Sequence, residues 1–205
     1  MSARLVRQPS NPFPITVRPT KADMTIANVV ARDTKPVPEE VARAFTWCAD
    51  EKVLLALAAA GWIASRRGSE PRRRAGNHAL LVTVAASLLP HGFKLLFDQT
   101  RPDRKTVCGH INGIPFSGKR DDAFPSGHAL HMGALASAVG TLPPGPRRTI
   151  RAFAVGLSLT RIAILAHWAS DVAAGFAIGV GLERLLRLWT GYAGEALTDD
   201  DDAVS

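Results

Sequence analysis

The chain has 205 residues, 46% of them hydrophobic and 21% charged, which is enough for one domain with one core. Its formal net charge of +7 fits a partner that is nucleic acid, anionic lipid or a phosphorylated substrate, but no aromatic-basic interleaving or nucleic-acid motif accompanies the charge, so nucleic acid is disfavoured. Two cysteines are too few for a disulfide scaffold, and their spacing is not that of a zinc site.

The first part of the chain differs from the rest. Prolines at positions 12, 14, 19, 36 and 38 and the lack of a sustained apolar period predict a flexible N-terminal arm over residues 1 to 37. Residues 38 to 40, Pro-Glu-Glu, are typical of a helix start with acids in the first turn. The first twenty residues lack the apolar core of a cleavable signal peptide, so we expect the chain's own helices to direct it to a membrane.

Five apolar segments follow, and all of them favour helix over strand. They cover about residues 53 to 65, 79 to 97, 128 to 142, 150 to 167 and 169 to 189. Abundant Ala and Gly within them suit closely packed membrane helices. The first segment is shorter than the ~20 residues needed to span a bilayer, unless its helix begins near residue 41. The sequence therefore predicts an all-α membrane bundle of five or six helices over residues 38 to 192, and an acidic, solvated tail over residues 193 to 205.

Arginine clusters suggest how such a bundle lies in a membrane. Residues 66 to 74 and 143 to 151 are Arg-rich, and Arg184 and Arg187 follow the last segment. If the first cluster is cytoplasmic, as positively charged loops usually are, successive crossings place the second cluster and the tail inside as well. Residues 98 to 127 and the region near 167 then lie outside. We expect a multi-pass inner-membrane protein with its chemistry on the extracytoplasmic side.

Three motifs carry that chemistry. The first runs from Lys94 to Arg101 and Pro102, the second is Pro-Ser-Gly-His at residues 125 to 128, and the third combines Thr160, Arg161, His167 and Asp171. Each alone has an ordinary structural explanation, such as a Lys at a helix end or a helix cap.

Together the motifs supply what a phosphoryl group requires. Lys94, Arg101 and Arg161 provide positive charge for the equatorial oxygens. Ser126 and Gly127 open a predicted helix, whose free amides and dipole favour an anion.

The third motif also predicts a local fold. His167 and Asp171 are four residues apart and are predicted to share a helix face, so we expect Asp171 to hold one ring nitrogen of His167 and present the other. Arg161 and His167 are six apart, which on an unbroken helix would separate them by ~240°. We therefore expect a helix to end near Leu165 so that the two side chains converge.

In order and spacing, the motifs resemble the signature of the type 2 phosphatidic acid phosphatase superfamily, which includes bacterial acid phosphatases and vanadium haloperoxidases. Ten of eleven signature positions match over about residues 50 to 190, and the departure is Thr160, where the family usually has Ser. The resemblance implies that His167 is the nucleophile, Asp171 orients it, and His128 protonates the leaving oxygen. It further implies a phosphate cradle of Lys94, Arg101, Ser126, Gly127 and Arg161, and no metal or other cofactor.

Several other polar residues lie within or beside the three motifs. His131 lies one turn after His128, but no third ligand is spaced for a metal, so a supporting or pore-lining role is favoured. Asp98, Asp103 and Asp122 flank the motifs, and we expect solvated loop charges, with pairing to a cradle Arg as the alternative. Two further positions, Cys48 and Cys108, fall on the outer side and either form a disulfide or stay free thiols.

The resemblance implies a phosphatase acting on membrane lipid phosphates, with polyprenyl diphosphate, phosphatidate and phosphatidylglycerol phosphate equally open as substrates. Alternatives are a vanadate-dependent haloperoxidase, a soluble acid phosphatase, or a silent lipid-binding scaffold. Membrane residence disfavours the haloperoxidase, and the lack of a signal-peptide pattern disfavours the soluble acid phosphatase. The complete set of histidines, aspartate and cations disfavours the scaffold. The oligomeric state is left open.

Overall fold

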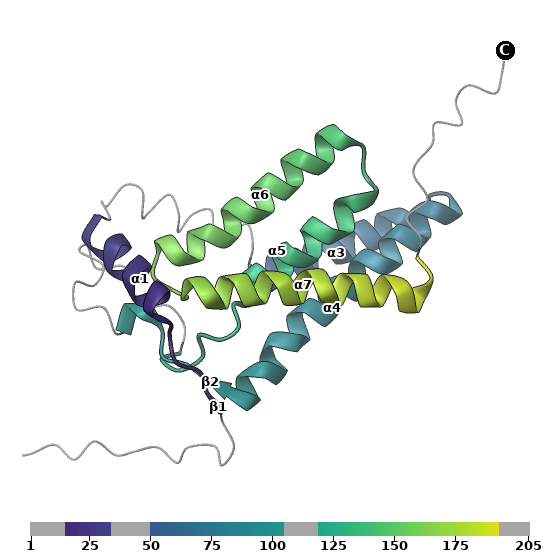
Figure 1. Ribbon diagram of the computed structural model, residues 1–205. Coiled ribbons are helices and arrows are strands. Elements are labelled where there is room, and N and C mark those ends of the chain that lie inside the picture. Colours follow the sequence, from purple (N-terminus) through teal and green to yellow (C-terminus); the bar gives the residue numbers. More distant parts are fainter. Residues whose placement is uncertain (1–14, 34–49, 105–118, 193–205) are drawn as a thin grey trace, which may run out of the picture.

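The computed structural model describes residues 15–33, 50–104 and 119–192, and these residues form a helical bundle (Figure 1). Six α-helices are present in this part of the chain: α1 (Lys21–Asp33), α3 (Glu51–Ser65), α4 (Glu70–Leu96), α5 (Gly127–Ala138), α6 (Pro144–Ala163) and α7 (Ala169–Thr190). Two-residue strands β1 (Ile15–Thr16) and β2 (Phe97–Asp98) pair in parallel, and short 3₁₀ turns η1 (Pro102–Arg104) and η2 (Val139–Thr141) complete the elements. The prediction of an all-α bundle is confirmed.

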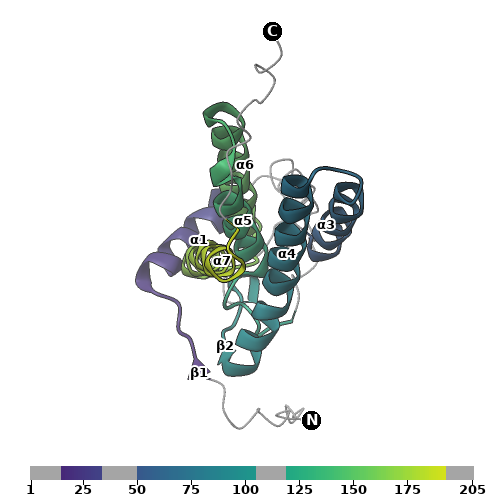
Figure 2. The ribbon, with the colours of Figure 1, turned by 90° about the vertical axis from the view of Figure 1, so that its right-hand side faces the viewer.

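Helix α5 lies at the centre of the bundle. It packs against α4, α6 and most closely α7, while α3 lies outside α4 (Figure 2). The core between α5 and α6 consists of Met132, Ala136, Ala154 and Leu157. Consecutive helices from α3 to α7 run in alternating directions, so the starts of α3, α5 and α7 meet the ends of α4 and α6 at one end of the bundle.

Glycines bring α5 and α7 together. A Cβ atom added to Gly179 would lie 1.9 Å from the Leu130 carbonyl oxygen, and one added to Gly175 would lie 2.4 Å from the Ser126 carbonyl oxygen. Gly133 on α5 faces the backbone of α7 in the same way, 2.0 Å from the Phe176 carbonyl oxygen. Small residues at such positions allow two helix backbones to approach closely, as they do between membrane helices.

Most of the predicted helices are found, but their ends differ. The segment predicted at 169 to 189 is α7, and the one predicted at 150 to 167 is α6, which starts earlier and ends at Ala163. The helix end expected near Leu165 is confirmed: Leu165 has φ of 53°, in the left-handed region, which reverses the chain between Arg161 and His167. The first Arg-rich stretch, residues 66 to 74, is expected to form a loop. This prediction is wrong in part, because residues 70 to 74 form the beginning of α4.

The prediction of a helix-free arm is wrong for Lys21–Asp33. Helix α1 starts where Thr20 and Asp23 cap each other, which offsets the effect of the nearby Pro19. The helix start predicted at residues 38 to 40 and the two cysteines lie outside the described residues, and the boundaries of arm, body and tail stay predictions.

Replacing Gly179 by Ala is expected to destabilise the fold by about 1–3 kcal/mol, because the added methyl group would overlap the Leu130 carbonyl and force α5 and α7 apart. Thermal unfolding of the detergent-purified protein measures the effect. Gly181→Ala is the matched control: it lies on the same helix, its Cβ would meet nothing within 4 Å, and we expect no loss of stability. Equal melting temperatures for the two variants would contradict the packing described here.

Candidate active site

The three motifs meet at the end of the bundle where α4 and α6 end and α5 and α7 begin. There they line a cleft of about 270 Å³. Six of the eight predicted site residues line this cleft: Lys94, Arg101, Gly127, His128, Arg161 and His167. Other lining residues are Asp50, Glu51, Pro90, His91, Asp122 and His131. The two that do not line it, Ser126 and Asp171, are fully buried behind it.

His167 lies in the short loop between α6 and α7. Its Nδ1 is 2.6 Å from the Ala123 carbonyl oxygen, and its Nε2 is 3.4 Å from an Arg101 guanidinium nitrogen. A carbonyl only accepts hydrogen bonds, so Nδ1 carries the proton and Nε2 keeps its lone pair. The lone pair is therefore on the nitrogen next to the cationic side of the cleft.

The surroundings of His167 favour the neutral ring. Burial, together with the positive charges of Arg101 and Arg161, lowers the pKa of His167 well below its ordinary value. A neutral imidazole at neutral pH is the form that can act as a nucleophile.

Asp171 supports the loop rather than bonding directly to the ring. Its Oδ2 accepts from the Trp168 amide at 3.0 Å, which caps α7, and lies 4.0 Å from His167 Nδ1. With its amide nitrogen facing Asp171, Gln99 donates to both carboxylate oxygens, at 2.6 and 3.1 Å. His167 precedes α7, so the two residues do not share a helix face as expected, and the nearest partner of Nδ1 is Ala123. The orienting role of Asp171 stays a prediction.

Arg101 is buried and tightly held. Its guanidinium donates to the Ala166 carbonyl at 2.9 Å and pairs with Asp122 at 2.8 Å. Lys94 Nζ lies 3.5 Å from the other oxygen of Asp122. The expectation that Asp122 is a solvated loop charge is therefore wrong, and its alternative, pairing with a cradle Arg, is what the structure shows. Asp122 fixes two cations beside the cleft.

The second motif is divided between cleft and support. Gly127 and His128 begin α5 and line the cleft. Ser126 caps α5 by accepting from the Ala129 amide at 3.4 Å, and its own N–H donates to the Asp171 carbonyl at 3.2 Å. Ser126 thus connects the second motif to the third, and its amide is already used instead of being available to an anion.

Two residues that support the site were not predicted from the sequence. Ala123 acts through its backbone carbonyl, which no side-chain pattern reveals, and Gln99 lies inside the first motif at a position with no assigned chemistry.

His131 is buried, 3.1 Å from Ser87 Oγ and 3.0 Å from the Gly127 carbonyl oxygen. Among residues 15–33, 50–104 and 119–192, no group of three or more His, Cys, Asp or Glu side chains is arranged to hold a metal.

An antiparallel helical bundle with a buried histidine and three cations at one end defines an all-α protein whose cleft surrounds a histidine with positive charge. The chain belongs to the PAP2 superfamily, whose family model matches residues 75–195. This confirms the resemblance drawn from the three motifs.

Two curated relatives are lipid A 1-phosphatases. The chain is 36% identical to the one from Rhizobium johnstonii over 111 residues, which are 54% of this chain and 46% of the relative. It is 36% identical to the one from Rhizobium etli over 105 residues, which are 51% and 45%. The chain therefore matches about half the length of these relatives.

Two solved structures share the fold. Aquifex aeolicus LpxE aligns with a TM-score of 0.64 and 17% identity, covering 80% of this chain and 93% of that one. A transmembrane PAP2-type phosphatidylglycerolphosphate phosphatase from Bacillus subtilis aligns with a TM-score of 0.64 and 21% identity, covering 83% and 85%. The helical bundle is thus that of membrane PAP2 phosphatases.

If His167 must be neutral to react, the acid limb that it sets in the pH profile of kcat/KM should lie below pH ~6.5. Arg101→Gln removes a positive charge that opposes protonation, so the pKa of His167 should rise and the acid limb should move to higher pH. Comparing the two enzymes on one substrate cancels the ionisation of the substrate itself. An acid limb that stays fixed or moves to lower pH would contradict this assignment.

Proposed function

We propose that this chain is a membrane phosphatase that hydrolyses lipid phosphate monoesters or diphosphates through a phosphohistidine intermediate. The observation that carries the proposal is the position of His167 Nε2, a lone-pair nitrogen held next to Arg101 in a cleft that Lys94 and Arg161 also line. Family membership and the names of the relatives support it.

The chemistry follows from this placement. The phosphoryl oxygens are held by Lys94, Arg101 and Arg161 while the His167 Nε2 lone pair forms a bond to phosphorus. The bond between phosphorus and the leaving oxygen breaks, and His128 donates a proton to that oxygen. Water then attacks phosphorus, His128 accepts its proton, and inorganic phosphate leaves as the N–P bond breaks. The fixed cations stabilise the charge on phosphorus in both steps.

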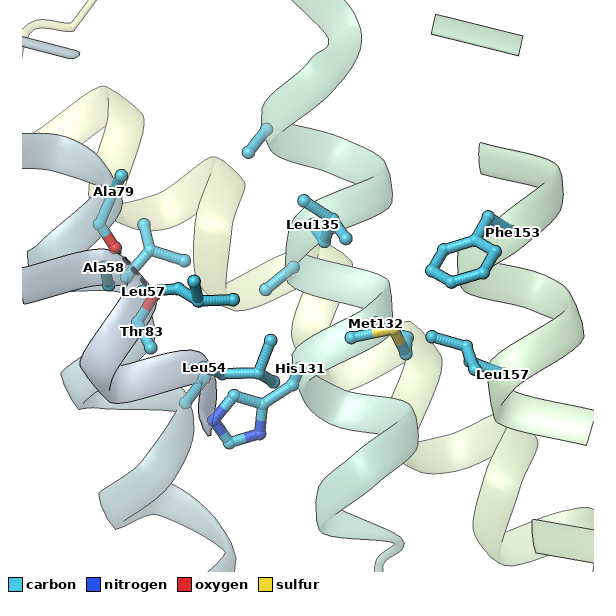
Figure 3. Close-up of a pocket in the computed structure, with 14 residues that line it drawn as sticks. Leu54, Leu57, Ala58, Ala79, Thr83, His131, Met132, Leu135, Phe153 and Leu157 are labelled. Atoms are coloured by element: carbon cyan, nitrogen blue, oxygen red, sulfur yellow. Dashed lines mark hydrogen bonds between the residues drawn. The ribbon is translucent and has the colours of Figure 1, made fainter. Parts of the chain in front are cut away.

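A second, apolar pocket of about 440 Å³ adjoins the cleft and fits the lipid part of such a substrate (Figure 3). It lies between α3, α4, α5 and α6, and His131 lines both cavities. Figure 3 shows the His131 ring at one edge of the pocket, near Leu54, while Phe153 and Leu157 form the opposite side. A lipid whose phosphate enters the cleft could place an acyl or prenyl chain here.

Membrane residence is supported by the outer surface. Its large exposed apolar side chains are spread over five helices, namely Met24, Ile26 and Val29 on α1, Val53, Leu57 and Ile63 on α3, Val84, Leu88, Leu95 and Leu96 on α4, Phe153, Val155 and Leu159 on α6, and Leu185, Leu188 and Trp189 on α7. By length and composition, one helix in the described part of the chain, α4, is able to cross a membrane on its own. Arg66, Arg147 and Arg187 lie toward the end opposite the cleft, so a multi-pass arrangement with the cleft on the extracytoplasmic side obeys the positive-inside rule.

Phosphate release by the detergent-purified protein tests the mechanism. The wild type should release phosphate from at least one member of a panel of lipid A 1-phosphate, phosphatidylglycerol phosphate, phosphatidate and polyprenyl diphosphate, with EDTA present. His167→Ala should reduce the rate by at least ~10³-fold, because the nucleophile is absent. The ranking across the panel identifies the lipid class.

His167→Asn is the second variant, because its amide can still donate to the Ala123 carbonyl while forming no phosphoenzyme. We expect it to be as inactive as His167→Ala with a melting temperature closer to wild type. Release that disappears with EDTA, or that survives in both variants, would sink the phosphohistidine mechanism. A folded wild type that is inert on every lipid would instead favour a lipid-binding scaffold.

Filling the apolar pocket should impair lipid substrates alone. Ala58 lines the pocket, and Ala58→Trp should raise KM for a long-chain lipid phosphate roughly tenfold, by about 1.4 kcal/mol, while kinetics on a water-soluble phosphate ester stay unchanged. Ala60→Trp on the exposed side of the same helix is the control. Equal effects on lipid and soluble substrates would contradict a tail site here.

A further inference from the structure

Residues 15–33 lie outside the part of the chain that the family model matches, yet they contact the first and third motifs of the site. Figure 1 shows α1 beside the start of α7, and β1 beside the end of α4. This segment, Ile15–Asp33, is called the N-terminal clamp below.

The strongest contact of the clamp is made by Asp23, which is 2% exposed. Its Oδ1 accepts from the Ser170 amide at 2.9 Å, and its Oδ2 accepts from the Ser170 hydroxyl at 2.8 Å. Thr20 donates to the same carboxylate from its amide and its hydroxyl, both at 2.8 Å. Asp23 therefore caps two helices at once, its own and α7.

The position of Ser170 gives this contact its importance. Ser170 is in the first turn of α7, between Trp168, whose amide Asp171 caps, and Asp171 itself. The loop that holds His167 ends at this turn. A carboxylate bound to Ser170 thus holds the first turn of α7 in addition to Asp171, and its negative charge is favourable at a helix N-terminus.

Helix α1 also packs against the backbone around His167. Ala27 and Ala31 are buried against Ala123, Leu165 and Trp168. Ala123 is the residue whose carbonyl accepts from His167, and Leu165 is the residue with the left-handed backbone. The clamp therefore covers both the hydrogen-bond partner of His167 and the turn that presents it.

The other end of the clamp contacts the first motif. β1 pairs with β2, and the Val17 amide donates to the Asp98 carbonyl at 2.9 Å. Asp98 lies between Lys94 and Arg101, the two cations of that motif. The clamp thus contacts both the C-terminal end of α4, through β2, and the start of α7.

The Asp23 carboxylate is ionised in this setting. Burial acts to raise its pKa, but the hydrogen bonds from Ser170 and Thr20 outweigh burial and lower the pKa below its ordinary value. An ionised acceptor makes stronger hydrogen bonds than a neutral one, which suits a residue that joins two elements.

We propose that the N-terminal clamp supports the active site from outside, and that Asp23, through Ser170, is a positioning residue that keeps His167 Nε2 in line for attack on phosphorus. This rests on the proposed function, and it assigns a role to a segment whose sequence predicted only a flexible arm. Asp23 touches neither substrate nor phosphorus; it acts through the loop that carries His167.

The kinetic test uses the full chain on its best substrate, well below the melting temperature. Asp23→Ala should lower kcat roughly ten- to a hundredfold with KM within about twofold of wild type, because misplacing a nucleophile by about 1 Å costs rate more than binding. Asp23→Asn, which can still accept from the Ser170 amide, should recover part of the loss. Asn28→Ala, on the exposed side of α1, should match wild type.

Ser170→Ala removes only the hydroxyl contact and keeps the amide contact, so it should lower kcat less than Asp23→Ala does. In the double variant the two losses should not add, because both residues act through one interaction. Additive losses would show that Asp23 acts elsewhere.

Hydrogen exchange followed by mass spectrometry tests the clamp without any turnover. In Asp23→Ala, amides of residues 119–126 and 164–172 should exchange faster than in wild type, while those of α5 and the distal half of α7 stay unchanged. Asn28→Ala should leave all of these unchanged. Unaltered exchange near His167, or an unaltered kcat in Asp23→Ala, overturns the proposal.

The two experiments separate two failures. A wild type that releases no phosphate contradicts the proposed function. Faster amide exchange near His167 in Asp23→Ala would even then show that the clamp stabilises the His167 loop. If the wild type is active and Asp23→Ala and Asn28→Ala lower kcat equally, the positioning role of Asp23 is contradicted. The proposed phosphatase function is then unaffected.

Discussion

The hydrogen bond from His167 Nδ1 to the Ala123 carbonyl is the interaction on which the site depends, because it fixes which ring nitrogen carries the proton. It requires a chain reversal directly before His167, and the left-handed backbone of Leu165 supplies one. It also requires Ala123, far away in sequence, to lie against the same loop. The bundle satisfies both needs by ending α6 and starting α7 next to the segment that precedes α5.

Charged side chains of both signs surround this hydrogen bond. Arg101 and Arg161 border the cleft, where a phosphoryl group would need them, and they also disfavour a charged His167. Asp122 lines the same cleft and pairs with both Arg101 and Lys94. A buried cation is costly unless it is paired, so this carboxylate offsets the cost of burying Arg101.

The sequence predicted the bundle, because long Ala- and Gly-rich apolar segments have few other folds. It also predicted that three motifs with fixed spacing form one site, and six of the eight predicted residues line the same cleft. It correctly located the turn near Leu165 from the six-residue spacing of Arg161 and His167. It missed what depends on tertiary contact. Ala123 acts through backbone, and the pairing of Asp122 follows only once the first and second motifs are adjacent. Helix α1 was missed because its stability comes from a cap and from two buried alanines, and neither produces a strong apolar period.

The start of α7 depends on a segment that lies outside the family match. α7 is held along its length by close backbone contact with α5 at Gly175 and Gly179, but its first turn extends past α5 toward the His167 loop. Helix starts carry unsatisfied amides, and where they are shielded from water they need protein acceptors. Asp171 accepts from the Trp168 amide from within α7, and Asp23 accepts from the Ser170 amide from outside it. The bundle alone places His167 near Arg101 and Arg161, whereas the Ser170 amide at the start of α7 takes its acceptor from the N-terminal clamp.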